Sequence, residues 1–351
     1  MLEYDFGPGH PLKPERLRRA IVLLGRYGFE SPVDPGPGDP RDALRVHSEE
    51  FVEAVRRLSA DSGALGWEMA RYGFGAGDNP PFCGMYEASL AYVAGTVEAA
   101  KAVRDGEKLA FNLSGGLHHA RRAEASGFCV FNDPAIAVHI LLEKFERVAY
   151  VDIDVHHGDG VQWLWYDDPR VLTCSIHQDG RTLYPGTGFV EETGEAFTSV
   201  NVPLWPGTTG DVWLWAFEEG VLPFLAAFEP QAIVLQMGTD AHFLDPLAHL
   251  QVSAQEWLRA VDLVKAVGAP IVAVGGGGYN LTTVPRMWAA ATLTLAGIAF
   301  EDEIPADLAE RWEMPRFFDA ALPGPRGIGK EHAEQAVGRL REHLLPNLTS
   351  K

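Results

Sequence analysis

Short apolar segments recur along the chain, and each one ends in a group of glycine or polar residues. Segments that are apolar throughout and rich in β-branched residues predict strands buried on both faces, as in a parallel sheet. Longer segments with apolar residues three and four positions apart predict helices. The predicted strands are 109–113, 148–154, 171–176, 232–238 and 270–275. The predicted helices are 86–104, 134–145, 211–228, 253–267 and 283–299.

This alternation predicts the α/β class, with a mostly parallel central sheet and helices on both faces. A hydrophobic content of 46% over 351 residues supports a large core. Segment 34–40, rich in proline and glycine, predicts a loop, and segment 333–344 predicts a final surface helix. We predict a single domain over residues 1–351, with the chemical motifs in about 4–300 and with 301–351 packed as an extension.

The segment VDIDVHHGDG at 151–160 places aspartate and histidine at the end of a predicted buried strand. Because side chains alternate along a strand, Asp152, Asp154 and His156 point to one face. Ligands collect at the carboxyl ends of strands in open α/β sheets. A carboxylate set that includes imidazole suits Zn²⁺ or Fe²⁺, whereas an all-oxygen set would favour Mg²⁺ or Ca²⁺. The segment therefore predicts a metal site, and a loop of solvated charges is the alternative.

Other strand ends carry further candidate chemistry. His118 and His119 follow a Gly-Gly pair. Two adjacent imidazoles suit proton transfer because histidine titrates near neutral pH, although such pairs are often simply exposed. Asp240 follows another apolar segment and is a further candidate metal ligand. Tyr279 follows four glycines, which allow positive φ and can bring the hydroxyl into a cleft. A packed aromatic ring is the alternative, and the glycines match neither a P-loop nor a dinucleotide fingerprint.

Together these motifs resemble the histone deacetylase family of zinc amidohydrolases. In chain order they are YDFGPGHPLKPERL (4–17), SGGLHHA (114–120), GFCVFND (127–133), VDIDVHHGDGVQ (151–162), SIHQDGRTLYPGTG (175–188), QMGTDAHFLDP (236–246) and GGGGYN (275–280). The short opening and the GMYEAS segment at 84–89 resemble the bacterial branch that includes acetoin utilization proteins. The resemblance implies the arginase-like version of the α/β architecture.

For the chemistry, the resemblance implies a metal set and a catalytic set. Asp154, His156 and Asp240 would hold one Zn²⁺, and Fe²⁺ would fit the same ligands. The implied catalytic residues are His118, His119 and Tyr279, with Asp152 orienting His118 and Asp159 orienting His119. His119 would be the main general base, and Tyr279 would donate a hydrogen bond to the oxyanion.

The resemblance also implies a channel for the lysine side chain and a second ion. The implied substrate-binding residues are Gly127, through its carbonyl, Phe128, Tyr184, Leu247 and, at the rim, Asp78. Arg16 would border an internal cavity behind the channel. A K⁺ or Na⁺ ion would lie beside the zinc, and its implied ligands are Asp152, Asp154, His156, Ser175 and the backbone of Ile176.

The implied function is zinc-dependent hydrolysis of the ε-amide of acetyl-lysine in a protein or peptide. A hydrolase of acetylpolyamines or another small amide on the same scaffold is one alternative, and an inactive acyl-lysine binding protein is another. The prolines that mark acetylpolyamine-cleaving relatives near the paired histidines are absent here, which favours a peptide substrate. The sequence leaves open the acyl length, the physiological substrate and the oligomeric state.

Charge and cysteine content narrow the partners. A formal net charge of −19 argues against direct nucleic-acid binding and fits a basic peptide, although it equally suits plain solubility. Cys83, Cys129 and Cys174 are too few and too scattered for a disulfide framework, which indicates a reducing compartment. The opening MLEYDFGPGH does not resemble a signal peptide, and no apolar segment approaches 18 residues. We therefore expect a cytoplasmic protein without a membrane partner.

Overall fold

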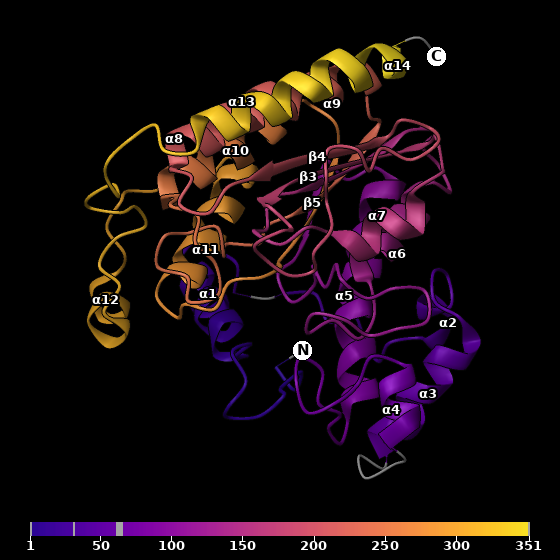
Figure 1. Cartoon of the computed structure of the whole chain (residues 1–351). Coiled ribbons are helices and arrows are strands. Elements are labelled where there is room, and N and C mark those ends of the chain that lie inside the picture. Colours follow the sequence, from indigo (N-terminus) through magenta and orange to yellow (C-terminus); the bar gives the residue numbers. More distant parts are fainter. Residues whose placement is uncertain (1, 31, 61–65, 350–351) are drawn as a thin grey trace.

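The computed structural model describes residues 2–30, 32–60 and 66–349 and is built around one sheet (Figure 1). Within these residues the sheet has six strands in the order β1-β6-β5-β2-β3-β4, and every adjacent pair is parallel. The strands are β1 (Leu109–Asn112), β2 (Val148–Asp152), β3 (Val171–Gln178), β4 (Ser199–Leu204), β5 (Ala232–Gln236) and β6 (Ile271–Val274). The predicted α/β class and parallel sheet are confirmed.

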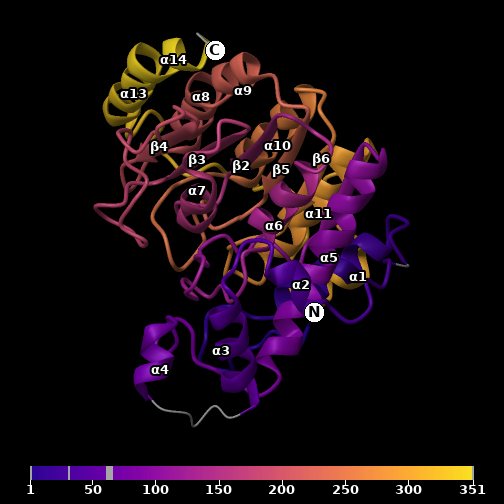
Figure 2. The same ribbon diagram turned by 90° about the vertical axis from the view of Figure 1, so that its right-hand side faces the viewer.

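Helices cover both faces of the sheet (Figures 1 and 2). On one side lie α1 (Glu15–Gly25), α8 (Gly210–Gly220), α9 (Leu222–Phe228), α10 (Ala254–Ala266), α11 (Thr283–Ala296) and α13 (Lys330–Arg339). On the other side lie α2 (Pro40–Ala43), α3 (Glu49–Ala60), α5 (Met85–Asp105), α6 (Asp133–Leu141) and α7 (Asp159–Trp165). The remaining elements are α4 (Gly66–Arg71), α12 (Ala306–Trp312), the π-helical turn η1 (Leu340–Leu344) and α14 (Leu345–Thr349).

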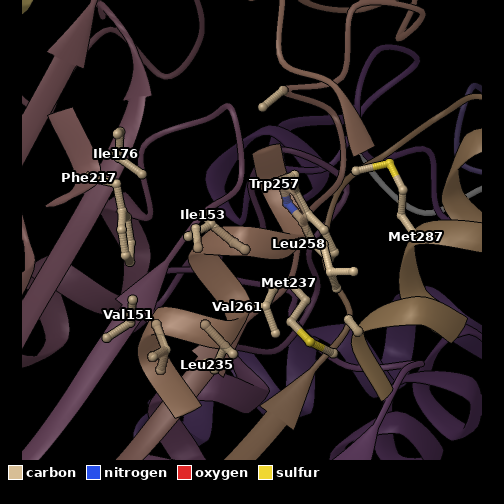
Figure 3. Close-up of a cluster of buried hydrophobic side chains, with 14 of the residues drawn as sticks. Val151, Ile153, Ile176, Phe217, Leu235, Met237, Trp257, Leu258, Val261 and Met287 are labelled. Atoms are coloured by element: carbon tan, nitrogen blue, oxygen red, sulfur yellow. The ribbon is translucent and has the colours of Figure 1, made fainter. Parts of the chain in front are cut away.

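Alternation along the strands divides the core into two clusters, one on each face. In β2, Val151 packs with the α8 to α11 side and its neighbour Tyr150 packs with the α5 and α6 side. Figure 3 shows the first cluster, in which Val151 and Leu235 lie near the helix residue Val261, and Trp257 lies beside Leu258. The Trp257 indole donates a 2.8 Å hydrogen bond to the carbonyl of Gly238. The core therefore anchors the loop after β5, which carries Asp240.

The elements differ from the prediction in three respects, and the first has a local cause. The predicted helix 211–228 is broken at Val221 between α8 and α9, because Pro223 has no N–H to continue the helical hydrogen bonds. The edge strand β4 was not predicted, although Val200, Val202 and Leu204 alternate with polar residues and proline. The other elements that were not predicted are helices α1, α2, α3, α4, α7, α12 and α14.

The C-terminal segment forms a continuous helical rod that lies on the sheet edge beside α8 and α9, drawn in yellow in Figure 1. The predicted surface helix 333–344 is present in α13 and η1, and it buries Ala333, Val337 and Leu340 against the core. Met1, Ser31 and residues 61–65 and 350–351 of the predicted domain lie outside the described residues. Among the helices that the structure describes, none combines the length and the hydropathy that crossing a bilayer requires.

Candidate active site

The candidate metal ligands converge at the carboxyl end of the sheet. Asp154 and His156 follow β2, and Asp240 follows the neighbouring strand β5. Their ligand atoms all lie within 4.8 Å of one another, and all three side chains are buried. His156 Nδ1 lies 3.1 Å from Asp154 Oδ1 and 3.0 Å from Asp240 Oδ2. Two carboxylates therefore share a single imidazole nitrogen.

The electrostatics of this trio fit a divalent cation. Burial and the neighbouring Asp154 carboxylate raise the pKa of Asp240 to about 7. Burial opposes the charged form of His156, but the two carboxylates prevail and raise its pKa to about 10. Positive charge is thus favoured between Asp154 and Asp240, and three ligands of mixed O and N type suit Zn²⁺ or Fe²⁺. Gln236 Nε2 and the Gly277 N–H donate to Asp154 Oδ2 at 2.8 and 2.7 Å and fix this carboxylate.

Beside the trio, two histidine–aspartate pairs meet. His118 Nδ1 lies 2.7 Å from Asp152 Oδ2, and His119 Nδ1 lies 2.7 Å from Asp159 Oδ1. The two Nε2 atoms are 3.0 Å apart. Both histidines lie on the loop after β1, whereas Asp152 is the last residue of β2 and Asp159 is the first residue of α7. The structure therefore brings together the four residues that the sequence predicted to act as two pairs.

The two imidazoles differ in protonation. Burial lowers the pKa of His119 to about 4, and the nearby His118 charge contributes in the same direction. Burial also disfavours the charged form of His118, but Asp152 and Asp154 outweigh it and raise that pKa to about 9. With these pKa values, the His119 ring is neutral at neutral pH and the His118 ring is charged. Such a pair can accept a proton at one ring and donate one from the other.

The glycine segment after β6 adopts conformations that only glycine adopts readily, with φ of 144° at Gly276 and 124° at Gly278. A Cβ on Gly277 would lie 2.1 Å from Asp240 Oδ2, so the segment passes directly over the metal ligands. Tyr279 emerges from it and lines the same cavity as His118 and His119. Arg16 is buried and donates to the carbonyls of Gly276 and Gly278 at 2.7 and 2.9 Å.

The cavity above the trio is narrow, with a volume of about 20 Å³. Gly127, Phe128 and Tyr279 line it, and the ring centroids of Phe128 and Tyr279 are 5.7 Å apart in an edge-on pair. A Cβ on Gly127 would lie 2.4 Å from His119 Cδ2, which explains why glycine occupies this position. The Tyr184 ring lies 5.0 Å from that of His119, and its hydroxyl bonds to Ser126. Aromatic walls and a narrow opening suit an uncharged, extended side chain.

Other predicted residues lie farther from the reacting centre. Asp78 is exposed near the opening, where its carbonyl lies 3.2 Å from Nε2 of His10, a ring that contacts Phe128. Leu247 is partly buried on the loop after β5 and does not line the cavity. In the predicted monovalent cation set, Ser175 pairs with Asp152 across β2 and β3, and the Ser175 hydroxyl bonds to His177. Ile176 follows on β3 and points into the core.

Sequence reasoning missed the residues that support the histidine loop. Asp133 accepts the N–H groups of Gly116 and Leu117, with shortest distances of 2.9 Å to each. Asn132 donates to the carbonyls of His118 and Ala120, at 3.0 and 2.8 Å. Asn132 is the N-cap of α6 and Asp133 is its first residue. Their hydrogen bonds hold the backbone from Gly116 to Ala120, around the histidine pair. They are the last two residues of the GFCVFND motif. Two polar residues directly after an apolar segment were a signal that could have identified them.

Comparison with known proteins agrees with this geometry. Residues 10–295 match the family model of the histone deacetylase domain. The chain belongs to the histone deacetylase family. Acetoin utilization protein AcuC of Bacillus subtilis (strain 168) is 39% identical over 325 residues, which are 88% of this chain and 84% of that protein. Histone deacetylase clr6 of Schizosaccharomyces pombe is 37% identical over 310 residues, which are 86% and 76% of the two chains.

Solved structures of histone deacetylase homologues share the fold. A crystal structure of an HDAC homolog complexed with SAHA superposes with a TM-score of 0.88 at 27% identity and covers 96% of each chain. An HDAC homolog from Aquifex aeolicus also gives a TM-score of 0.88, at 28% identity, and covers 96% of this chain and 98% of the homologue. The predicted family of hydrolases, its arginase-like fold and the likeness to acetoin utilization proteins are confirmed.

Proposed function

We propose that this protein is a zinc-dependent lysine deacetylase, which hydrolyses the ε-amide of acetyl-lysine in a protein or peptide. The observation that carries the proposal is the contact between the two histidine–aspartate pairs, with His118 and His119 Nε2 atoms 3.0 Å apart beside the metal-ligand trio. Hydrolysis of an amide needs a group that removes a proton from water and one that returns a proton to the amine. This arrangement offers both within one cavity.

Asp154, His156 and Asp240 would hold the metal. When bound, Zn²⁺ would supply the Lewis-acid chemistry of a hydrolase by polarising the amide carbonyl and lowering the pKa of water. Fe²⁺ would fit the same three ligands. Three protein ligands leave coordination positions for substrate and water, as catalytic sites require.

The histidines and the tyrosine would divide the remaining work. His119, neutral and oriented by Asp159 at Nδ1, would accept a proton at Nε2 as the main general base. A protonated imidazole of the pair would then return a proton to the lysine nitrogen as the C–N bond breaks, so the products are acetate and free lysine. Tyr279 would donate its hydroxyl hydrogen bond to the oxyanion that forms on the carbonyl oxygen. The Tyr279 hydroxyl has no protein partner among residues 2–30, 32–60 and 66–349, which suits this role.

The lysine chain would lie between Phe128 and Tyr184, with its amide N–H bonded to the carbonyl of Gly127. Support comes from Phe128 and Tyr279 in the lining of the cavity and from the Tyr184 ring, which lies 5.0 Å from that of His119. Asp78 and Leu247 would contact the peptide outside the channel. The net charge of −19 favours a peptide with basic residues around the acetyl-lysine.

We also propose a K⁺ or Na⁺ site beside the zinc, formed by the residues that the family resemblance implies. Those residues are Asp152, Asp154, His156, Ser175 and the backbone of Ile176. The adjacent positions of Asp152 and Ser175 on β2 and β3 support it. Such an ion would offset the negative charge of Asp152 and Asp154, which are both buried.

The direct test is acetate release from an acetyl-lysine peptide by metal-stripped protein, with and without one equivalent of Zn²⁺. Acetylspermidine serves as the competing small substrate. Peptide cleavage that returns with zinc is the expected result. Cleavage of acetylspermidine alone would assign the protein to small-amide hydrolysis. Tight peptide binding without acetate release would make it an acyl-lysine binding protein, and either result would overturn the proposal.

A further inference from the structure

We propose that Asp245 is a positioning residue for Tyr279, and that it acts through a hydrogen bond to the tyrosine backbone. The inference rests on the proposed function, in which the Tyr279 hydroxyl stabilises the oxyanion. Asp245 does not line the cavity and contacts neither the metal ligands nor the histidine pair by a hydrogen bond in the described part of the chain. Within the described residues, its hydrogen-bond link to the catalytic groups therefore runs through Tyr279.

The Asp245 carboxylate ties two loops together. It is 7% exposed, which is unusual for an aspartate that lies on a loop. Oδ1 accepts the N–H of Leu247 at 3.0 Å, within its own loop, and Oδ2 accepts the N–H of Tyr279 at 2.7 Å, across to the loop after β6. Hydrogen bonds to an ionised carboxylate are stronger than those between neutral groups. Asn280 Nδ2 adds a second link, to the carbonyl of Leu244 at 3.1 Å.

Tyr279 needs such support because the segment before it is glycine. Glycine has the largest backbone freedom of any residue, so four in succession leave the direction of the following side chain poorly defined. Bulkier residues cannot stiffen the segment, since a Cβ on Gly278 would lie 2.2 Å from Thr239 Oγ1. The bond from Asp245 acts at the Tyr279 N–H itself, where the chain leaves the glycines. It therefore restricts the angle at which the ring enters the cavity.

The loop of Asp245 is in turn anchored to the body of the protein. The Asp245 N–H donates to the carbonyl of His242 at 2.8 Å. His242 Nε2 lies 3.0 Å from Asp319 Oδ2, and Arg286 of α11 donates to Asp319 Oδ1 at 2.5 Å. His242, Asp319 and Arg286 thus hold the loop that carries the Asp245 carboxylate, and this carboxylate holds the N–H of Tyr279. Without these contacts of its loop, Asp245 would move with Tyr279 and could not position it.

The test compares D245A, which removes both acceptor oxygens, and D245N, which keeps the volume, with the wild-type enzyme reconstituted with zinc. We expect kcat on an acetyl-lysine peptide to fall about 10- to 100-fold in D245A, because misplacement of a catalytic group by about 1 Å has effects of this size. The zinc content should change less than twofold, since no metal ligand is altered, and KM should change less than kcat, because Leu247 lies outside the cavity. D168A is the matched control: Asp168 also accepts a backbone N–H two residues ahead, from Arg170 at 3.0 Å, but lies outside the site.

A double-mutant cycle separates positioning from general damage. If Asp245 acts through the Tyr279 hydroxyl, D245A should cost little in a Y279F background, in which that hydroxyl is absent. An equal loss of single-turnover rate in both backgrounds would overturn the proposal, as would a kcat of D245A within twofold of wild type. A loss confined to zinc binding would overturn it as well.

Hydrogen exchange keeps this test independent of the proposed function. If the wild-type enzyme releases no acetate, the deacetylase proposal fails, but the tether is still measurable as protection of the amides in residues 275–281. We expect exchange of this segment to be at least tenfold faster in D245A than in wild type or D168A. Unchanged exchange would show that Asp245 does not hold Tyr279.

Discussion

The Nε2 atoms of His118 and His119 lie 3.0 Å apart, while each Nδ1 is held by a different carboxylate, Asp152 or Asp159. Neighbours in the sequence thus have opposite electrostatic surroundings. His118 faces the acidic metal-ligand trio, whereas the carboxylate of Asp159 is shared with Arg121, whose guanidinium donates to it at 3.0 Å. Because of this difference, His119 is suited to accept a proton and His118 to carry one.

Replacement of His119 by alanine should lower kcat on an acetyl-lysine peptide by about 100- to 10,000-fold, the range for loss of a general base. The variant should stay folded with a lower unfolding midpoint, because the alanine removes the imidazole that bonds to the buried Asp159 carboxylate. Circular dichroism checks the fold, and His139→Ala, a change at a partly buried histidine of α6 outside the site, is the control. Full activity of the His119 variant would exclude it as the base.

Metal removal should destabilise the protein as well as inactivate it. Zn²⁺ at 100 times its Kd should add about 2.7 kcal/mol to the free energy of unfolding, because it binds the folded state alone. Thermal unfolding with and without zinc measures the shift. Asp240→Asn should abolish most of this response, since one of three ligands is lost, whereas Asp168→Asn should retain it. An equal zinc response in Asp240→Asn would place the metal elsewhere.

Gly127→Ala should impair both folding stability and activity. The residue has φ of 51°, and its new Cβ would lie 2.4 Å from His119 Cδ2. We expect a loss of about 1–3 kcal/mol in stability, the cost of backbone strain, and a lower kcat through displacement of the imidazole. Gly75→Ala is the control, because nothing lies within 4 Å of its Cβ position. Similar effects of the two substitutions would contradict this explanation.

Asp319 should make stability depend on acid pH. Burial disfavours its charge, but His242 and Arg286 outweigh burial and lower its pKa to about 2. An aspartate in the unfolded chain titrates near about 3.9, so the folded state binds the proton less tightly. The stabilisation, about 1–2 kcal/mol, is complete above the unfolded pKa and is lost as pH falls from about 5 to about 2.

Urea denaturation of metal-free wild type and Asp319→Asn over this pH range tests that expectation. The difference in unfolding free energy between the two proteins should be largest near pH 6 and should shrink toward pH 2. A difference that stays constant with pH would mean that Asp319 stabilises the protein without its charge.

Much of the site was predictable because chemistry in this fold gathers at strand ends. Asp154, Asp240, His118 and Tyr279 each follow an apolar strand by a few residues, and parallel strands place those ends at one edge. Periodicity predicted five strands of the sheet and the main helices that cover it, since a buried strand and an amphipathic helix each have a regular pattern of apolar residues. These patterns identify candidate ligands at the strand ends, and the resemblance to the histone deacetylase family implies which three of them form the metal set.

Other features depended on contacts between distant segments, which no local pattern records. The grip of Asp133 on the histidine loop, and of Asp245 on Tyr279, uses backbone N–H groups, which every residue except proline has. Which carboxylate meets which amide is decided when the loops pack together. The sequence by itself therefore determined the fold class and the reactive groups. Tertiary structure decided their protonation and support, because those arise from burial and from hydrogen bonds across the fold.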